Sequence, residues 1–205
     1  NGGNWIDDDH NTAAGTSLST AITLSGSSTI HIRIKDDAGN LGTATTQAYI
    51  LDTTAPTQTY STAIDISDDT GTSATDFNTN TAAQTLTATL SAAIASDDIL
   101  QVSINAGVAW TNDDHATNDG TALSTGIVLT DDTTSAIHVR ITDDAGNSGT
   151  AATQAYILDT TAPTQTYSNV DISADTGSAN DDFITKTAAQ TLSATLSAAI
   201  AADDI

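Results

Sequence analysis

The sequence predicts an all-β protein made of antiparallel β-sandwich repeats, and two features of the chain predict it. Short apolar segments alternate with polar residues at a period of two, and turns rich in Gly, Asn and Asp separate them. This pattern is typical of antiparallel sheets. The chain also repeats itself, with 106 or 107 residues between matching segments. A repeat of this length is too long for a solenoid turn or a propeller blade, so each repeat is expected to be a domain.

The repeat is carried by three pairs of long matching segments. They are IHIRIKDDAGN at 30–40 with IHVRITDDAGN at 137–147, AYILDTTAPTQTYS at 48–61 and again at 155–168, and TAAQTLTATLSAAIASDDI at 81–99 with TAAQTLSATLSAAIAADDI at 187–205. The pairs divide the chain into three units. The N-terminal unit, residues 1–54, is the C-terminal half of a repeat. The central unit, residues 55–161, is a complete repeat, and the C-terminal unit, residues 162–205, is the N-terminal half of the next repeat.

In the central unit, six segments have the alternation of strands. They are 57–66, 83–92, 99–105, 122–130, 136–142 and 152–159. Segment 83–92 is rich in Ala, but its β-branched Thr residues favour a strand over a helix. About seven strands in roughly 100 residues predict an immunoglobulin-like sandwich. The predicted fold class is therefore all-β, with tandem immunoglobulin-like antiparallel β-sandwich repeats, and Trp110 is the expected core aromatic.

Charge and composition exclude several classes of protein. The chain has 26 acidic residues, all Asp, and 4 Lys and Arg, for a net charge of −22. Nucleic acids and anionic membrane surfaces both require basic residues. No apolar run approaches the ~18 residues of a membrane span. Because the chain has no Cys, disulfides and thiolate metal sites are excluded. Self-repulsion of this size predicts that a bound cation offsets the charge.

Four short motifs occur in a fixed order along the repeat. LDTTAPT is followed by DISDDTG at 65–71, or DISADTG at 171–177, then by a Trp and a strand that closes in DDAGN. This set resembles the bacterial immunoglobulin-like repeats of giant type I-secreted surface adhesins, which are calcium-dependent extender domains. The resemblance covers essentially the whole chain. It implies an extracellular rod of tandem domains at the cell surface, stiffened by Ca²⁺ at the junctions, that holds an adhesive region away from the cell, as in a biofilm.

The first candidate metal site is the acidic loop that follows the first strand. Asp65, Ser67, Asp69 and Asp76 occupy positions 1, 3, 5 and 12 of this loop, which are positions of oxygen ligands in a calcium loop. The C-terminal unit keeps the spacing with Asp171, Ser173, Asp175 and Asp182. Gly71 stands at position 7 rather than 6, and position 12 is Asp rather than Glu, so a true EF-hand is not expected. A solvated acidic turn is the alternative.

The second candidate joins the linker to the DDAGN turn. In an immunoglobulin-like sandwich the last strand ends at the pole opposite the preceding turn, so the end of one domain abuts that turn of the next. Asp52, repeated as Asp159, should then approach Asp143 and Asp144. Asp97 and Asp98 are expected nearby. The alternative is that DDAGN is simply a tight turn, in which Asp and Asn tolerate a left-handed backbone and Gly supplies a positive φ.

The remaining polar residues favour no catalytic function. His31 and His138 lie on the polar strand face, and His10 and His115 follow acidic runs; histidines that bind no metal are the simpler interpretation. No nucleophile elbow, catalytic Ser-His-Asp signature or phosphate-binding Gly loop is present. We therefore expect no enzyme.

Two functions of different classes are open. The first is a structural spacer of a calcium-rigidified adhesin or extracellular filament. The alternative is an adhesive module that itself contacts a carbohydrate, a surface or a protein. Near-identical repeats with two Trp at matching positions and four Tyr favour the spacer.

The expected partners are neighbouring repeats or copies of the chain itself, end to end. Residues 162–205 of one copy would pack with residues 1–54 of the next, because half-domains expose unpaired edges and half a core. A window of a longer array is an equally open interpretation. The remaining alternative is a compact monomer in which both halves fold back onto residues 55–161.

Overall fold

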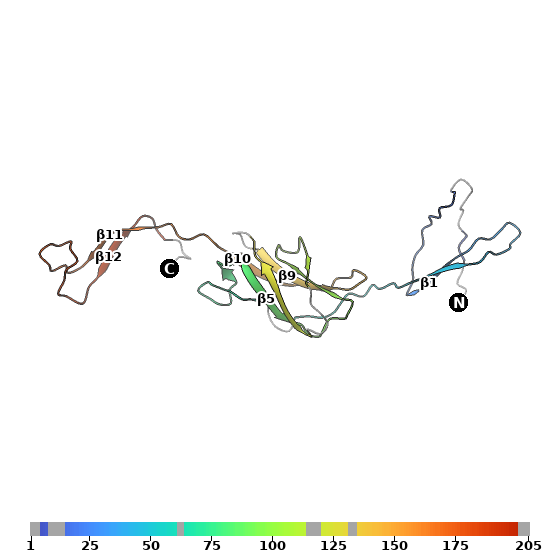
Figure 1. Cartoon of the computed structure of the whole chain (residues 1–205), viewed down its shortest axis with the longest axis horizontal. Coiled ribbons are helices and arrows are strands. Elements are labelled where there is room, and N and C mark those ends of the chain that lie inside the picture. Colours follow the sequence, from blue (N-terminus) through green and yellow to red (C-terminus); the bar gives the residue numbers. More distant parts are fainter. Residues whose placement is uncertain (1–4, 8–14, 61–63, 114–119, 131–134, 201–205) are drawn as a thin grey trace.

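A computed structural model describes residues 5–7, 15–60, 64–113, 120–130 and 135–200. These residues form twelve strands and contain no helix, so the prediction of an all-β protein is confirmed. Across the described ranges there is accordingly no helix long and apolar enough to cross a membrane. Figure 1 shows the strands in three groups along the chain, with the largest group in the middle.

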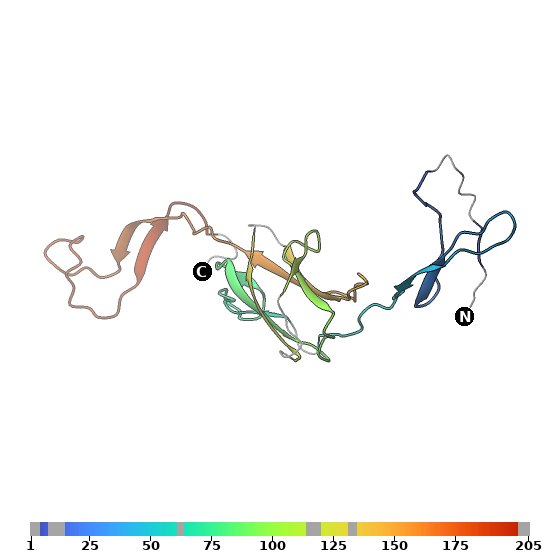
Figure 2. The same cartoon turned by 45° about the vertical axis from the view of Figure 1, so that its right-hand side comes forward.

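Two sheets make up the central unit. The smaller has the order β3 (Asp65–Ile66), β5 (Ala83–Thr89), β8 (Ala122–Val128). The larger has the order β4 (Asn78–Thr79), β10 (Ala152–Leu158), β9 (Ser135–Thr142), β6 (Ile99–Ser103), β7 (Thr111–Asn112). Buried residues from both sheets form one cluster, an arrangement consistent with a β-sandwich. Figure 2 shows this central group from a second direction.

Each flanking unit contains one antiparallel pair of strands. In the N-terminal unit β1 (Ser28–Ile32) pairs with β2 (Thr45–Tyr49). In the C-terminal unit β11 (Tyr167–Ile172) pairs with β12 (Leu192–Leu196), with a register irregularity between Ser168 and Asp171. The two pairs lie on opposite sides of the central unit (Figure 1), and no strand of either pairs with the central sheets. The compact arrangement with both halves folded back is therefore not what the described residues show.

The predicted antiparallel sheets are present, and one edge of the larger sheet departs from that pattern. β4 pairs in parallel with β10, through Asn78 opposite Ile157 and Thr79 opposite Leu158. Neither β4 nor β7 was predicted, because two residues are too few to show a period of two. The predicted first strand at 57–66 is reduced to β3 and an isolated bridge between Tyr60 and Leu90; residues 61–63 lie outside the described ranges.

The apolar core belongs entirely to the central unit. Every buried apolar side chain in the described residues falls between Ile64 and Leu158. On β9 the predicted alternation is confirmed, because Ile137, Val139 and Ile141 are all buried and the residues between them are partly exposed. Every second side chain of β9 therefore points into the apolar layer between the two sheets.

Trp110 is not the core aromatic. Its side chain is half-buried on the outer, polar side of β9, where the guanidinium carbon of Arg140 lies 3.9 Å from the ring centroid. His138 meets the same ring edge-on at 6.3 Å between centroids. The aromatic side chains in the core are those of Tyr156 on β10, which is 1% exposed, and Phe77. Trp110 immediately precedes the edge strand β7, so it covers the outside of the sheet. The same stack recurs between Trp5 and Arg33.

Removing the Tyr156 hydroxyl should destabilise the central unit. The hydroxyl lies 2.9 Å from the carbonyl oxygen of Ile104 and 3.1 Å from that of Thr130. Tyr156→Phe removes both contacts, although the Ile104 oxygen still accepts from the Ser135 hydroxyl at 3.1 Å. We expect a loss of about 1–3 kcal/mol in the free energy of unfolding, measured by denaturant titration. The matched control is Tyr49→Phe at the counterpart position, where the hydroxyl makes an exposed 3.3 Å bond to Ser25. Equal losses in both variants would contradict the prediction.

Candidate metal-binding loops

The acidic loop of the central unit is anchored on Gln84, a β5 side chain that is 4% exposed. Its Oε1 accepts hydrogen bonds from the Asp68 amide at 2.8 Å and the Ser67 hydroxyl at 3.1 Å. Its Nε2 donates to the carbonyl oxygens of Thr81, at 2.7 Å, and Asp68, at 3.1 Å. A buried amide must satisfy both its donors and its acceptor, so Gln84 fixes the loop to the sheet.

The loop carboxylates face different partners. Asp65 Oδ1 accepts from the amide of Ile66 at 3.0 Å, and Asp76 Oδ1 accepts from that of Asn78 at 3.1 Å. Asp69 Oδ2 accepts from the amide of Phe77 at 3.0 Å. The other oxygen, Asp69 Oδ1, is buried and has no hydrogen-bond partner. Of the four predicted ligands, Asp69 is therefore the one with a buried side-chain oxygen that has no hydrogen-bond partner.

The loop closes through an unusual backbone turn. Phe77 has a φ of 60°, a region that bulky side chains rarely adopt, and its side chain is in the core. At the other side of the turn, the Gly71 amide donates to the carbonyl oxygen of Asn78 at 3.0 Å. A Cβ on Gly71 would lie 3.0 Å from the same oxygen. This close approach gives Gly71 a structural role at position 7 of the loop.

The C-terminal unit repeats this loop without a core beneath it. Gln190 accepts from the amide of Ala174 at 2.8 Å, and Asp175 Oδ2 accepts from the amide of Phe183 at 2.9 Å. Phe183 again has a positive φ, of 58°, although its side chain is 49% exposed. Asp175 Oδ1 is again buried and unpaired. Asp171 and Asp182 bond the amides of Ile172 and Ile184. The geometry is therefore encoded locally.

The DDAGN turn is held by its first and last residues. The Asn147 amide donates to Asp143 Oδ1 at 2.7 Å, and the Asn147 side chain donates to Asp143 Oδ2 at 2.8 Å. These hydrogen bonds, the side-chain bond first, hold the pKa of Asp143 below its ordinary value,. Gly146 has a φ of 91°, as expected for this turn. The same Asn side chain lies 3.2 Å from the carbonyl oxygen of Asp52, so the linker rests on the turn.

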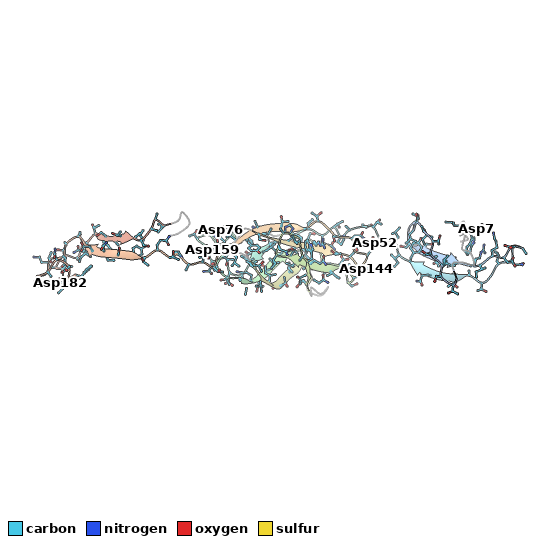
Figure 3. All side chains as sticks on the ribbon, turned by 90° about the horizontal axis from the view of Figure 1, so that it is seen from above. Asp7, Asp52, Asp76, Asp144, Asp159 and Asp182 are labelled. Carbon is cyan, nitrogen blue, oxygen red and sulfur yellow. The ribbon has the colours of Figure 1, made fainter. Side chains whose placement is uncertain are left out.

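Four carboxylates gather around this turn. Partial burial raises the pKa of Asp98, and the charges of Asp97, Asp143 and Asp144 raise it further, against a hydrogen bond with the Ala95 backbone. Figure 3 places Asp52 and Asp144 at the same end of the central unit. Asp52 approaches through its backbone carbonyl, because its carboxylate bonds the Thr54 amide at 2.8 Å. The acidic side chains Asp97, Asp98, Asp143 and Asp144 therefore lie near one another, whereas Asp52 contacts the turn through its backbone carbonyl.

The two candidate sites lie at opposite ends of the central unit. Asp76 and Asp159 share one end, and Asp52 and Asp144 share the other (Figure 3). The Asp159 amide donates to the carbonyl oxygen of Thr79 at 3.0 Å, and its carboxylate caps the Thr161 amide at 2.8 Å. Asp182 belongs to the loop of the C-terminal unit, apart from both ends. The acidic loop of a repeat therefore faces the same junction as the linker that follows that repeat.

The side chains in place fit a cation only in part. In the described ranges, no three Asp or His side chains stand close enough together to hold a metal ion by themselves. The features that do fit a cation are the buried, unpaired oxygens of Asp69 and Asp175, since Ca²⁺ also accepts backbone carbonyls and water as ligands. His31 and His138 each lie edge-on to a Trp ring; His10 and His115 lie outside the described residues.

Sequence patterns did not reveal Gln84 and Asn147, which organise the two loops. A signal for Gln84 was present, because it occupies the same strand face as Leu86 and Ala88. A polar residue in the apolar phase of a strand indicates a buried hydrogen-bonded side chain. Asn147 was assigned only to the turn, and its contact with the linker depends on the tertiary fold.

The comparisons with known proteins identify no family. No protein-family model matches the chain, and no curated protein matches it.

The raised pKa of Asp98 and the lowered pKa of Asp143, near the DDAGN turn, should both be measurable. In a ¹³C carboxyl NMR titration, we expect Asp98 to titrate above the ordinary Asp value and Asp143 below it. For Asp143 the lowered pKa means that its stabilising contribution is present above the ordinary pKa and is lost as pH falls through the lowered one. Asn147→Ala should move the Asp143 titration upward and leave that of Asp36, which Asn40 holds in the same way, unchanged. Asp143 titrating at or above Asp98 would contradict this assignment.

Proposed function

We propose that the chain is a structural extender segment, built of tandem immunoglobulin-like sandwiches, in an extracellular calcium-dependent adhesin or filament. The observation that carries the proposal is the identical strand register of successive units. Ser28 pairs with Tyr49 in the N-terminal unit as Ser135 pairs with Tyr156 in the central unit. A chain that repeats one domain geometry in sequence is suited to span distance.

The junction between the first two units supports a spacer role. The linker carbonyl of Asp52 meets the Asn147 side chain, and a Cβ on Gly149 would lie 2.7 Å from the carbonyl oxygen of Pro56. Gly149 thus allows the linker to run close against the end of the central unit. A linker held at several points transmits orientation from one domain to the next better than a free one.

Calcium is the proposed cofactor at both ends of each repeat. In the acidic loop the proposed ligands are Asp65, Ser67, Asp69 and Asp76, with Asp171, Asp175 and Asp182 in the next copy. At the first linker they are Asp52, Asp97, Asp143 and Asp144, and Asp159 takes the place of Asp52 at the second linker. The buried unpaired oxygen of Asp69 supports the first set. The raised pKa of Asp98 supports the second: partial burial raises it first, and the charges of Asp97, Asp143 and Asp144, which a divalent cation would offset, raise it further,. The net charge of −22 adds a general reason for cation binding,.

The alternative of an adhesive binding module has less support. Binding platforms for sugars need an open aromatic face, whereas Trp5 and Trp110 each stack on an Arg guanidinium, at 3.7 and 3.9 Å. The proposed location is the cell surface, which rests on the resemblance of the repeat motifs alone.

Chelation should lower the melting temperature and increase flexibility. If Ca²⁺ occupies the loop, Asp69→Ala should weaken its binding to the central unit at least about tenfold, measured by isothermal titration calorimetry. Asp76→Ala should weaken binding as well. Asp68→Ala is the matched control, because its carboxylate meets only the Ser67 hydroxyl, at 3.2 Å, and Ala174 occupies its place in the next copy.

Two outcomes would reject the calcium proposal. One is an unchanged melting curve in chelator, with no metal found by elemental analysis. The other is an effect of Asp68→Ala as large as that of Asp69→Ala, which would show that the register of the loop is wrong. The spacer proposal is tested separately by small-angle scattering, in which a flexible, collapsed chain with Ca²⁺ present would contradict a rod.

A further inference from the structure

Among the described residues, β8 is the longest edge strand of the central unit. The two sheets of this unit have four edge strands, and three of them, β3, β4 and β7, are two residues long. β8 has seven residues, and no described strand pairs with its side away from β5. Proteins commonly protect such an edge by shortening it or by placing a charge or a Pro on it. The sequence ALSTGIV of β8 contains neither, so its edge is open to pairing.

The backbone groups of β8 alternate between the two sides of the strand. Directly after β8, the Leu129 amide donates to the carbonyl oxygen of Ala82 at 2.8 Å, in the register of the β5 ladder. Because every second residue of an antiparallel strand bonds its neighbour, the odd-numbered residues of β8 bond β5. The even-numbered residues direct their amides and carbonyls to the open edge. These residues are Ala122, Ser124, Gly126 and Val128.

An open groove lies beside the second half of this edge. Its volume is about 410 Å³, and its walls are residues 125–128 of β8 and, across from them, residues 102–105, 109 and 111–113. Val102, Ile104 and Ile127 make much of this lining apolar. Because successive side chains of a strand point to opposite faces, a strand paired with β8 would place every second side chain in the groove. The groove therefore favours a segment with apolar residues at alternate positions.

Charge decides between a second copy of the chain and a different partner. Among the described residues that line the groove, Asp113 is the charged one, and the whole chain has a net charge of −22. A second copy would carry the same excess of negative charge and would be repelled at long range. A segment that contains Lys or Arg is attracted by the same field. Charge complementarity therefore favours a cationic partner.

We propose that the open edge of β8 binds an extended, cationic segment of a partner protein by β-strand addition. The segment pairs antiparallel with β8, as β5 does on the other side. Its residues opposite Ser124, Gly126 and Val128 bond the β8 backbone and direct Lys or Arg side chains to solvent. The residues between them place apolar side chains in the groove. The proposal adds a lateral docking surface to the proposed spacer, and it requires no Ca²⁺ site.

Synthetic peptides test the pairing on the full chain. The probe is fluorescein-labelled, C-terminally amidated Val-Lys-Val-Lys-Val-Lys-Val, and its binding is measured by fluorescence anisotropy. N-methylation of its three Lys amides should weaken binding at least about tenfold, because these amides face β8. N-methylation of three Val amides, which face away from β8, should leave binding nearly unchanged. Equal effects of the two methylation patterns would overturn the proposal.

Position 126 provides a matched pair of variants. Gly126→Pro removes one outward amide and no ladder bond to β5, and Gly126 does not have a positive φ, so an edge position can accept the Pro. Gly126→Ala keeps the amide, and its Cβ would meet no atom within 4 Å. We expect Gly126→Pro to weaken binding of the Lys peptide at least about tenfold and Gly126→Ala to leave it nearly unchanged. Equal binding by the two folded variants, or equal binding of an analogue with Glu in place of Lys, would overturn the proposal.

Hydrogen exchange of the unsubstituted chain, followed by NMR, provides a readout that needs no variant. In the free chain the amides of Ser124, Gly126 and Val128 should exchange faster than those of the odd-numbered β8 residues, which bond β5. A saturating concentration of the Lys peptide should slow the exchange of these three amides at least about tenfold. If they are already protected in the free chain, or become protected without peptide as the chain concentration rises, the edge has another occupant and the proposal is overturned.

Discussion

A half-sandwich of this chain cannot bury its own apolar face, and the rest of the structure depends on this constraint. In the central unit the sheet that contains β5 covers the sheet that contains β9, and the buried residues of both form one cluster. In the flanking units the same apolar residues stand in solvent, although β1 and β2 keep the register of β9 and β10. Strand pairing is local, whereas core formation requires both layers.

The loops behave differently from the core because hydrogen bonds hold them. The hydrogen-bond network around Gln84 recurs around Gln190. The recurrence includes the buried, unpaired oxygen of Asp69 and Asp175 and the positive φ of Phe77 and Phe183. In the C-terminal unit this geometry persists with an exposed Phe183 side chain. The hydrogen-bonded geometry of the acidic loop therefore forms in both copies, whether or not an apolar core lies beneath the loop. A loop that keeps its shape without a core can present the same oxygen atoms at every junction.

The carboxylates near the DDAGN turn lie in a chain of strong negative net charge. Asp97, Asp98, Asp143 and Asp144 lie near one another at one end of the central unit. Partial burial raises the pKa of Asp98, and the charges of the other three carboxylates raise it further. Asp143 is stabilised in the charged form by Asn147. Hydrogen bonds thus stabilise the charged form of Asp143, whereas burial and nearby negative charges destabilise the charged form of Asp98. A bound cation would stabilise the charged form of Asp98 as well.

The sequence by itself determined the all-β class, the alternation on β9 and the matching loops, because each depends on residues close together in the chain. It did not determine that Tyr156 rather than Trp110 fills the core, because the two rings differ in the sheet face they occupy and not in local pattern. The parallel pairing of β4 with β10 and the contact of Asn147 with the linker were likewise decided by tertiary structure. Each joins segments about 80 or more residues apart, and no local period or propensity specifies which distant backbone meets which.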